Sequence, residues 1–145
     1  MARFRGLHEY SGDVFRSLFE LQLARELKEK HKVKYEYERW QYEYFQKVPN
    51  GVCQDCDGTH VSKRQWYTPD FILPNGVVIE AKGYFTASDR TKLQAVREAH
   101  DSIDLRLVFM ADNKINRRSE MRYSDWCNRY KFQYAVGNIP EDWIK

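Results

Sequence analysis

Residues 67–83 read YTPDFILPNGVVIEAKG, and this stretch decides the fold. The apolar runs FIL and VVI flank the turn-forming residues PNG, which predicts two strands joined by a tight hairpin. Pro is favoured at the second position of a type I turn and Gly at the fourth, so the loop fits three residues that close in a glycine bulge. In that register Leu73 faces Val77, and the pairing continued outward places Asp70 opposite Glu80.

One face of this hairpin gathers charged side chains. Two opposed carboxylates destabilise a strand pair, so the arrangement makes sense mainly with a cation between them. Lys82 follows Glu80 by two residues and projects from the same face because strand side chains alternate. A two-residue type I′ turn at the N-G pair is the alternative. It opposes Asp70 to Ala81, moves Glu80 to the other face and leaves no metal site.

The rest of the chain shows helical and strand patterns in turn. Helices are expected where apolar residues recur at three and four, at 13–30, 88–100 and 124–130. Strands are expected where aromatic and β-branched residues gather, at 33–44, 65–67, 103–110 and 132–135. Ser88 is the expected N-cap of the second helix, the strand at 103–110 should be central, and a last turn begins at Pro140. This order predicts an α/β single domain over residues 1–145, with a mixed sheet flanked by helices.

Composition permits one compact core and excludes several classes of protein. The 145 residues are 42% hydrophobic and 15% aromatic, with 24 basic against 21 acidic residues and a net charge of +3, so charge alone does not indicate a nucleic-acid binder. Residues 1–10 contain no apolar run typical of a signal peptide, and no segment approaches the ~20 apolar residues of a membrane span. We therefore expect a cytoplasmic protein without a membrane partner, with its three cysteines reduced.

The hairpin resembles the PD...ExK signature of the restriction-endonuclease-like nucleases. Pro69 and Asp70 match its first half, and E-A-K at 80–82 matches its second half. Within that superfamily the chain resembles most closely the phage endonuclease I family of Holliday-junction resolvases. The similarity extends over nearly the whole chain, including 15–20, 35–40, 105–109 and 139–145. It implies a restriction-endonuclease-like fold in a phage-encoded protein.

The resemblance also implies the composition of an active site. Glu20, Asp70 and Glu80 would form the acidic metal site, Ala81 would add its backbone carbonyl, and Lys82 would be the catalytic lysine. Hard oxygen ligands suit Mg²⁺ or Mn²⁺, expected as a pair in each site. Lys82 would position the attacking water or neutralise charge on the phosphoryl oxygens. Taken without the resemblance, a solvated helix edge is the favoured interpretation of Glu20, and Asp70 and Lys82 fit ordinary strand positions.

The activity implied by the resemblance is Mg-dependent hydrolysis of phosphodiesters in four-way and branched DNA by a homodimer. In that family the dimer is domain-swapped, so Glu20 of one chain completes the site formed by Asp70, Glu80 and Lys82 of its partner. The extended segment at 40–48 has no Gly or Pro and suits such a bridge. The alternatives are a sequence-specific or transposon-end endonuclease with the same core, and a catalytically dead DNA-binding module.

Two further groups of residues suggest binding sites. Cys53 and Cys56 form a CxxC motif, with His60 close behind, in an inserted polar excursion at about 49–64 that departs from the family pattern. They offer three ligands to Zn²⁺, and a reduced metal-free loop is the alternative. Basic residues expected to follow the DNA backbone are Lys63, Arg64, Lys114, Arg117, Arg118 and Arg122. Solvated surface is the default for each, and the denser group at 114–122 is favoured for DNA contact.

Overall fold

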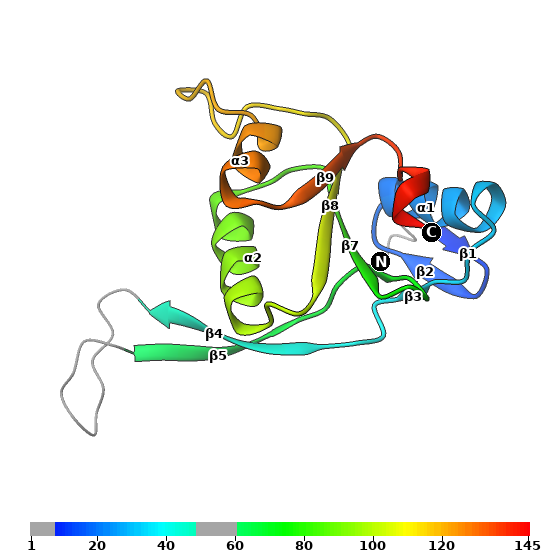
Figure 1. Ribbon diagram of the computed structural model, residues 1–145, viewed down its shortest axis with the longest axis horizontal. Coiled ribbons are helices and arrows are strands. Elements are labelled where there is room, and N and C mark those ends of the chain that lie inside the picture. The colour runs from blue at the N-terminus through cyan, green and yellow to red at the C-terminus, as the bar shows by residue number, and fades with distance from the viewer. Residues whose placement is uncertain (1–7, 49–60) are drawn as a thin grey trace, which may run out of the picture.

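A computed structural model describes residues 8–48 and 61–145 of the chain, arranged around a five-stranded mixed sheet (Figure 1). The strand order is β3-β6-β7-β8-β9. The bounds are β3 Glu36–Tyr37, β6 Phe71–Ile72, β7 Val77–Lys82, β8 Asp104–Phe109 and β9 Gln133–Val136. β7, β8 and β9 run parallel, whereas β3 and β6 join antiparallel at one edge. The predicted α/β class is confirmed, and β8 is an internal strand as expected.

The β6–β7 hairpin has the register that turn chemistry predicts. The Leu73 amide donates to the Val77 carbonyl at 2.9 Å, and the Gly76 amide donates to the Leu73 carbonyl at 2.9 Å. Gly76 has φ +91°, which a glycine adopts freely. The three-residue loop is therefore present and the two-residue alternative is wrong. Continued outward, this register brings Asp70 opposite Glu80.

The N-terminal part begins with a hairpin where we expected the first turn of a helix. Its elements are β1 His8–Tyr10, β2 Asp13–Phe15, α1 Leu18–Arg25 and a π-helical turn at Glu26–Lys30. Ser11 and Gly12 join the two strands with positive φ of 54° and 89°, a conformation that closes tight hairpins. The predicted helix over 13–30 therefore starts only at Leu18, with Ser17 as its N-cap.

A two-stranded ribbon extends from the body of the molecule (Figure 1). It pairs β4, Tyr42–Val48, with β5, Val61–Tyr67. The strand expected over 33–44 is divided into β3 and β4 because Glu38 has φ +49°, which turns the chain. β5 also includes 61–64, which we expected in the polar excursion. The rest of that excursion, with Cys53, Cys56 and His60, lies outside the described residues.

Two hydrophobic cores lie on opposite faces of the sheet. Alternate residues of β7 enter them, Ile79 one core and Val78 the other. The first core joins α1 to the C-terminal 3₁₀ turn, Glu141–Trp143. The second joins the sheet to α2, Ala87–Ala99, and α3, Tyr123–Tyr130. No helix in the described parts of the chain is long and apolar enough to cross a membrane.

The N-cap of α2 is Thr86 and not Ser88, so that prediction is wrong. The Asp89 amide donates to Thr86 Oγ1 at 3.1 Å, and the Thr86 amide donates to Asp89 Oδ2 at 3.0 Å. This reciprocal capping box starts the helix at Ala87. Leu93 is buried on the inner face as expected, and Asp89 is fixed at the carboxyl end of β7.

Candidate active site

Asp70 and Glu80 are two buried carboxylates on the paired arms of the β6–β7 hairpin. Asp70 is 7% exposed, and its Oδ2 accepts a hydrogen bond from the Ala81 amide at 2.8 Å. Glu80 is 6% exposed, and its Oε2 accepts a 2.5 Å hydrogen bond from the Tyr67 hydroxyl. Acidic groups are almost never buried without a partner, so this pair of carboxylates indicates a functional site.

Glu20 reaches the same region from α1. Ser17 caps the helix, because the Glu20 amide donates to Ser17 Oγ at 3.1 Å and that hydroxyl in turn donates to Glu20 Oε2 at 2.8 Å. The Tyr37 hydroxyl on β3 donates to Glu20 Oε1 at 3.3 Å. Glu20 is only 7% exposed, so the alternative of a solvated helix edge is wrong.

Three carboxylates converge where α1 meets the edge of the sheet. Glu20, Glu38 and Asp70 each offer an oxygen, and these atoms lie within 4.8 Å of one another. Sequence reasoning missed Glu38, which the β3–β6 pairing brings opposite Asp70, with its amide donating to the Asp70 carbonyl at 3.1 Å. Arg16 Nε lies 2.9 Å from Glu38 Oε1, so Glu38 already has a cationic partner. Glu20 and Asp70 are therefore the carboxylates of this group with most capacity for a metal ion.

Lys82 lies between two carboxylates at the end of β7. Its Nζ is 3.3 Å from Glu80 Oε1 and 3.3 Å from Asp89 Oδ1. Asp89 was not identified from the sequence, although the T-x-x-D capping pattern at 86–89 marks it. Glu80 is outside the group of three carboxylates because it faces Tyr67 and Lys82. Lys82 is thus held at the border of the acidic group.

The pKa values of the two hairpin carboxyls reflect burial and crowding. Burial raises the pKa of Asp70 well above its ordinary 3.8, and the nearby charges of Glu80 and Glu20 raise it further. Burial also raises the pKa of Glu80, against the opposing effects of Lys82 and the Tyr67 hydrogen bond. Burial alone would lower the pKa of Lys82, but Glu80 and Asp89 raise it overall. A divalent cation would relieve the carboxylate repulsion, and hard oxygen donors are the ligands that Mg²⁺ prefers.

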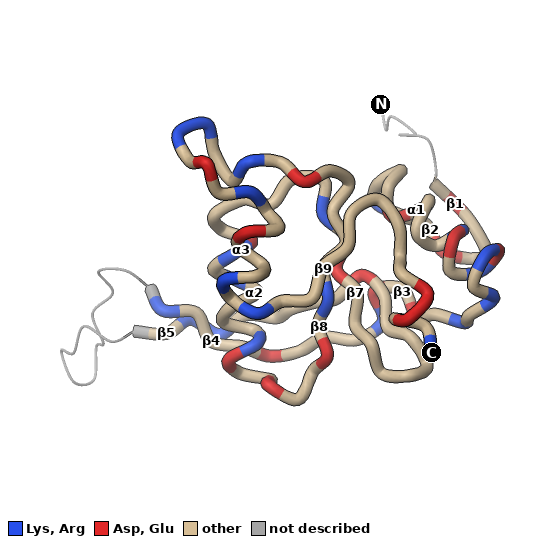
Figure 2. Tube along the Cα trace, turned by 45° about the horizontal axis from the view of Figure 1, so that its top comes forward, with Lys and Arg blue, Asp and Glu red and all other residues tan. Residues whose placement is uncertain are grey.

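The predicted DNA-contact residues lie on two separate surfaces. Arg64 on the β4–β5 ribbon pairs with Glu43 at 2.7 Å and lies over the Trp66 ring, while Lys63 beside it is exposed. The others occupy the loop between β8 and α3, coloured blue at its tip in Figure 2. They are Lys114, Arg117, Arg118 and Arg122, all exposed.

The basic loop starts beside Lys82. β7 and β8 run parallel with Lys82 paired to Phe109, and the Met110 amide donates to the Lys82 carbonyl at 3.0 Å. Lys114 contacts Glu120 at 3.3 Å, and the Arg122 side chain donates to the Asp112 carbonyl at 2.9 Å. Among the described residues, Arg117 and Arg118 have no acidic partner.

Comparison with known proteins identifies the family. The family model described as "Phage endonuclease I" matches residues 1–145. The chain belongs to the phage endonuclease I family. This membership confirms the predicted family and the prediction that the chain is a nuclease.

Two relatives align over most of the chain. "Endonuclease I" of Escherichia phage T7 is 34% identical over 133 residues, which cover 91% of this chain and 79% of that protein. "Endodeoxyribonuclease 1" of Enterobacteria phage T3 is 35% identical over 135 residues, covering 92% of this chain and 79% of that protein. The residues of the acidic group therefore lie in a chain whose relatives are named as nucleases.

Proposed function

We propose that this chain is an Mg²⁺-dependent endodeoxyribonuclease that cuts four-way and other branched DNA as a homodimer. The observation that carries the proposal is that carboxylate oxygens of buried Glu20 and Asp70 lie within 4.8 Å of each other. Glu80 lies opposite Asp70 in the hairpin register, and Lys82 follows Glu80 by two residues. The names of the T7 and T3 relatives, an endonuclease and an endodeoxyribonuclease, support DNA as the substrate. The choice of branched DNA rests on the family resemblance.

Each acidic residue has a place in the proposed chemistry. Glu20, Asp70 and Glu80 hold the metal ion, with the Ala81 carbonyl as a further ligand, while Arg16 keeps Glu38 partly neutralised. When bound, such an ion activates a water molecule and stabilises the negative charge that develops during phosphodiester hydrolysis. Mn²⁺ satisfies the same donor set.

Lys82 provides the positive charge of the proposed site. Glu80 and Asp89 hold its ammonium at 3.3 Å each, so the group is oriented before DNA binds. From there it donates to a non-bridging oxygen of the scissile phosphate, where negative charge grows in the transition state. The basic loop that follows β8 contacts phosphates farther along the strand.

A homodimer suits this substrate because a four-way junction has two strands that are cut symmetrically. The described contacts between Glu20 and Asp70 form within one chain, and the same contacts can form between two chains that exchange their parts before residue 40. Residues 39–41 lie between the last β3–β6 hydrogen bond, from the Glu38 amide, and the start of β4, so a hinge there breaks no strand pairing.

One assay tests the proposed activity. A synthetic four-way junction and a linear duplex of identical sequence are incubated with the protein in Mg²⁺ or in chelator. We expect cleavage of the junction, little cleavage of the duplex and none in chelator. Equal cleavage of both DNAs would reject junction selectivity, and full activity in chelator would reject the metal site.

A further inference from the structure

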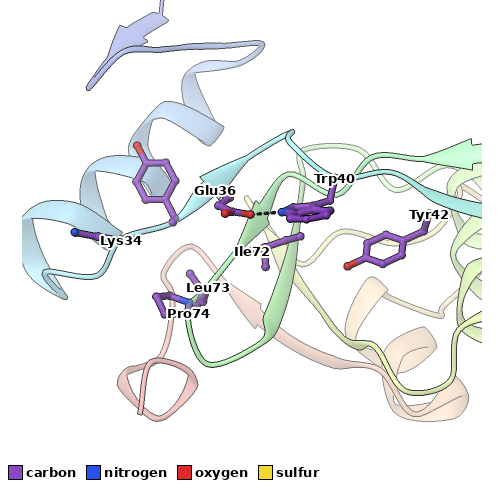
Figure 3. A pocket seen from close by; sticks show the side chains of 8 residues that line it. Lys34, Glu36, Trp40, Tyr42, Ile72, Leu73 and Pro74 are labelled. Atoms are coloured by element: carbon purple, nitrogen blue, oxygen red, sulfur yellow. Dashed lines mark hydrogen bonds between the residues drawn. The ribbon is translucent and has the colours of Figure 1, made fainter.

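A pocket of about 650 Å³ opens at the β3–β6 edge of the sheet (Figure 3). Its walls come from the chain around β3 and from the β6–β7 turn. The lining residues are Lys34, Tyr35, Glu36, Trp40, Tyr42, Ile72, Leu73 and Pro74. This volume falls within the ~300–1,000 Å³ range of pockets that bind small molecules, so a single nucleotide fits inside it.

The pocket and the acidic group are neighbours along the β3–β6 ladder. Ile72 of the pocket follows Asp70 by two residues, about 7 Å along the chain. Across the ladder, Glu36 pairs with Ile72, and the Glu38 amide binds the Asp70 carbonyl. A nucleotide next to a phosphate held at Asp70 therefore reaches the pocket.

Trp40 gives the pocket an aromatic wall that is already oriented. Its side chain is 56% exposed, an unusual state for a large aromatic residue. The indole Nε1 donates to Glu36 Oε2, which fixes the ring, and Figure 3 shows Tyr42 toward the same end of the pocket. An exposed ring held in place presents its face for stacking without the entropy cost of ordering it.

Polar groups of the pocket complement a nucleotide. Glu36 has a second carboxylate oxygen that can accept a hydrogen bond from an exocyclic amino group of a base. Lys34 lies at the far end from Trp40 and supplies a cation for a phosphate (Figure 3). Aromatic stacking for the base, an acceptor for its edge and a cation for its phosphate together match one nucleotide.

We propose that this pocket binds one unpaired nucleotide of the DNA strand held at the active site, with its base stacked on Trp40. A base inside a continuous duplex is stacked on both neighbours, whereas a branch point offers bases that leave the stack at lower cost. The pocket thus contributes to the recognition of branched DNA. This inference rests on the proposed function, because it requires a DNA strand at the acidic group.

The test combines a protein change with a DNA change. Abasic sites replace, one at a time, the nucleotides that flank the cut phosphate of a four-way junction, and binding is measured in chelator for the wild type and Trp40→Ala. We expect one position where the abasic site weakens wild-type binding roughly 5- to 150-fold, the effect of one base–aromatic stacking contact. Trp40→Ala should bind the intact junction more weakly by the same factor, and the abasic site at that position should not weaken its binding further. Trp40→Phe keeps an aromatic ring, so the abasic site at that position should still weaken its binding nearly as much as it weakens wild-type binding.

Matched variants distinguish the possible outcomes. Trp66→Ala removes an indole of similar exposure, 51%, from the ribbon, and its abasic profile should equal that of the wild type. If the effects of Trp40→Ala and of the abasic site on binding add at every position, the nucleotide pocket is overturned. The proposed function still stands in that case, provided that the wild type cleaves the junction. Failure of the wild type to cleave any junction would reject the proposed function itself. A change in the oligomeric state of Trp40→Ala without DNA would identify the pocket as a protein interface and overturn the inference.

Discussion

Asp70 reaches across its hairpin, and its Oδ2 accepts a 2.8 Å hydrogen bond from the Ala81 amide, the residue that separates Glu80 from Lys82. This contact ties the P-D and E-A-K halves of the signature together. Among the described residues, no hydrogen bond is made to Asp70 Oδ1, so that oxygen is available to a metal ion. The hairpin therefore acts as one unit in which backbone register sets the spacing of the charged groups.

The first prediction compares two members of the acidic group. Asp70→Asn should lower the rate of junction cleavage at least about 100-fold, because it removes metal-binding charge from the reacting centre. Junction binding should persist, since phosphate contacts come from basic residues. Glu38→Gln is the matched control, and it should have a smaller effect because Arg16 already pairs with Glu38. Cleavage rates and binding titrations on one junction measure both; equal reductions in the two variants would contradict the assignment.

The second prediction concerns stability and pH in the absence of metal. The pKa of Asp70 is raised above 3.8, so over the window that begins near pH 3.8 the folded state keeps a proton that the unfolded state has released. The unfolded state then binds fewer protons, and the contribution of Asp70 to the free energy of unfolding falls as pH rises. Asp70→Asn removes this fall.

Urea unfolding of both proteins in chelator, from pH 4 to pH 7, checks that sign. The stability of Asp70→Asn relative to wild type should increase with pH. Added Mg²⁺ should reduce the difference, because it binds the folded wild type. A stability difference between the two proteins that stays constant with pH would show that the pKa of Asp70 is not raised in the folded state.

The third prediction assigns Asp89 a positioning role. Asp89→Asn keeps an oxygen for the Thr86 cap but removes one of the two charges that hold Lys82. Cleavage should slow on the order of tenfold, equivalent to ~1.4 kcal/mol, with the melting temperature little changed. Asp125→Asn is the control, because Asp125 caps α3 in the same way, accepting from the Arg122 amide at 2.8 Å.

The pH profile of cleavage separates positioning from a purely structural role for Asp89. The Asp89 carboxylate helps to raise the pKa of Lys82, so its removal should move the alkaline limb of the profile to lower pH. The Asp125 control should leave that limb in place. A slower Asp89→Asn enzyme with an unshifted profile would argue that Asp89 does not act through Lys82.

The fourth prediction tests the basic loop between β8 and α3. Replacing Arg117 and Arg118 by Ala should weaken binding to junctions of every sequence. It should also reduce the slope of log K against log salt by about 2, because each phosphate that a cation neutralises adds roughly 0.9 to that slope. Lys30→Ala with Lys145→Ala removes equal charge from other exposed positions and serves as the control. If the salt slope of the Arg117 and Arg118 variant equals that of the wild type, these two side chains do not contact DNA phosphates.

Sequence reasoning succeeded where local chemistry decides structure. The P-N-G turn determines the register of Asp70 and Glu80, and strand alternation places Lys82 with them. The inner face of α2 and the internal position of β8 were also readable, because burial follows the spacing of apolar residues. These features depend on neighbours within a few residues.

The errors arise where local signals were overlooked or contacts are long-range. Gly12 has a positive φ and closes a hairpin where the apolar periodicity predicted a helix. The Thr86–Asp89 capping box starts α2 at Ala87, so Ser88 is not the N-cap. Glu38 joins the acidic group only through the pairing of β3 with β6, strands more than thirty residues apart in sequence. No local pattern specifies such a pairing, so Glu38 could not be found from spacing.

The last prediction asks whether each active site is built from one chain or from two. Co-expressing Glu20→Ala and Asp70→Asn chains with different tags, and purifying through both tags, isolates the mixed dimer. In a swapped dimer, Glu20 of one chain meets Asp70 of its partner, so one site carries both lesions and the other is intact. The mixed dimer should then nick one strand of a four-way junction. If each site is built within its own chain, both sites are damaged and the mixed dimer is inactive.

Two comparisons make the mixed-dimer result decisive. Each variant purified alone as a homodimer should be inactive, because every site then has a lesion in either arrangement. A mixed dimer of wild type with Asp70→Asn retains one intact site in both arrangements and sets the rate expected for a single working site. Nicking by the Glu20→Ala and Asp70→Asn pair at that rate supports exchange at the hinge of residues 39–41. Complete inactivity, with the wild-type pair still nicking, rejects the swap and leaves the contacts between Glu20 and Asp70 within one chain.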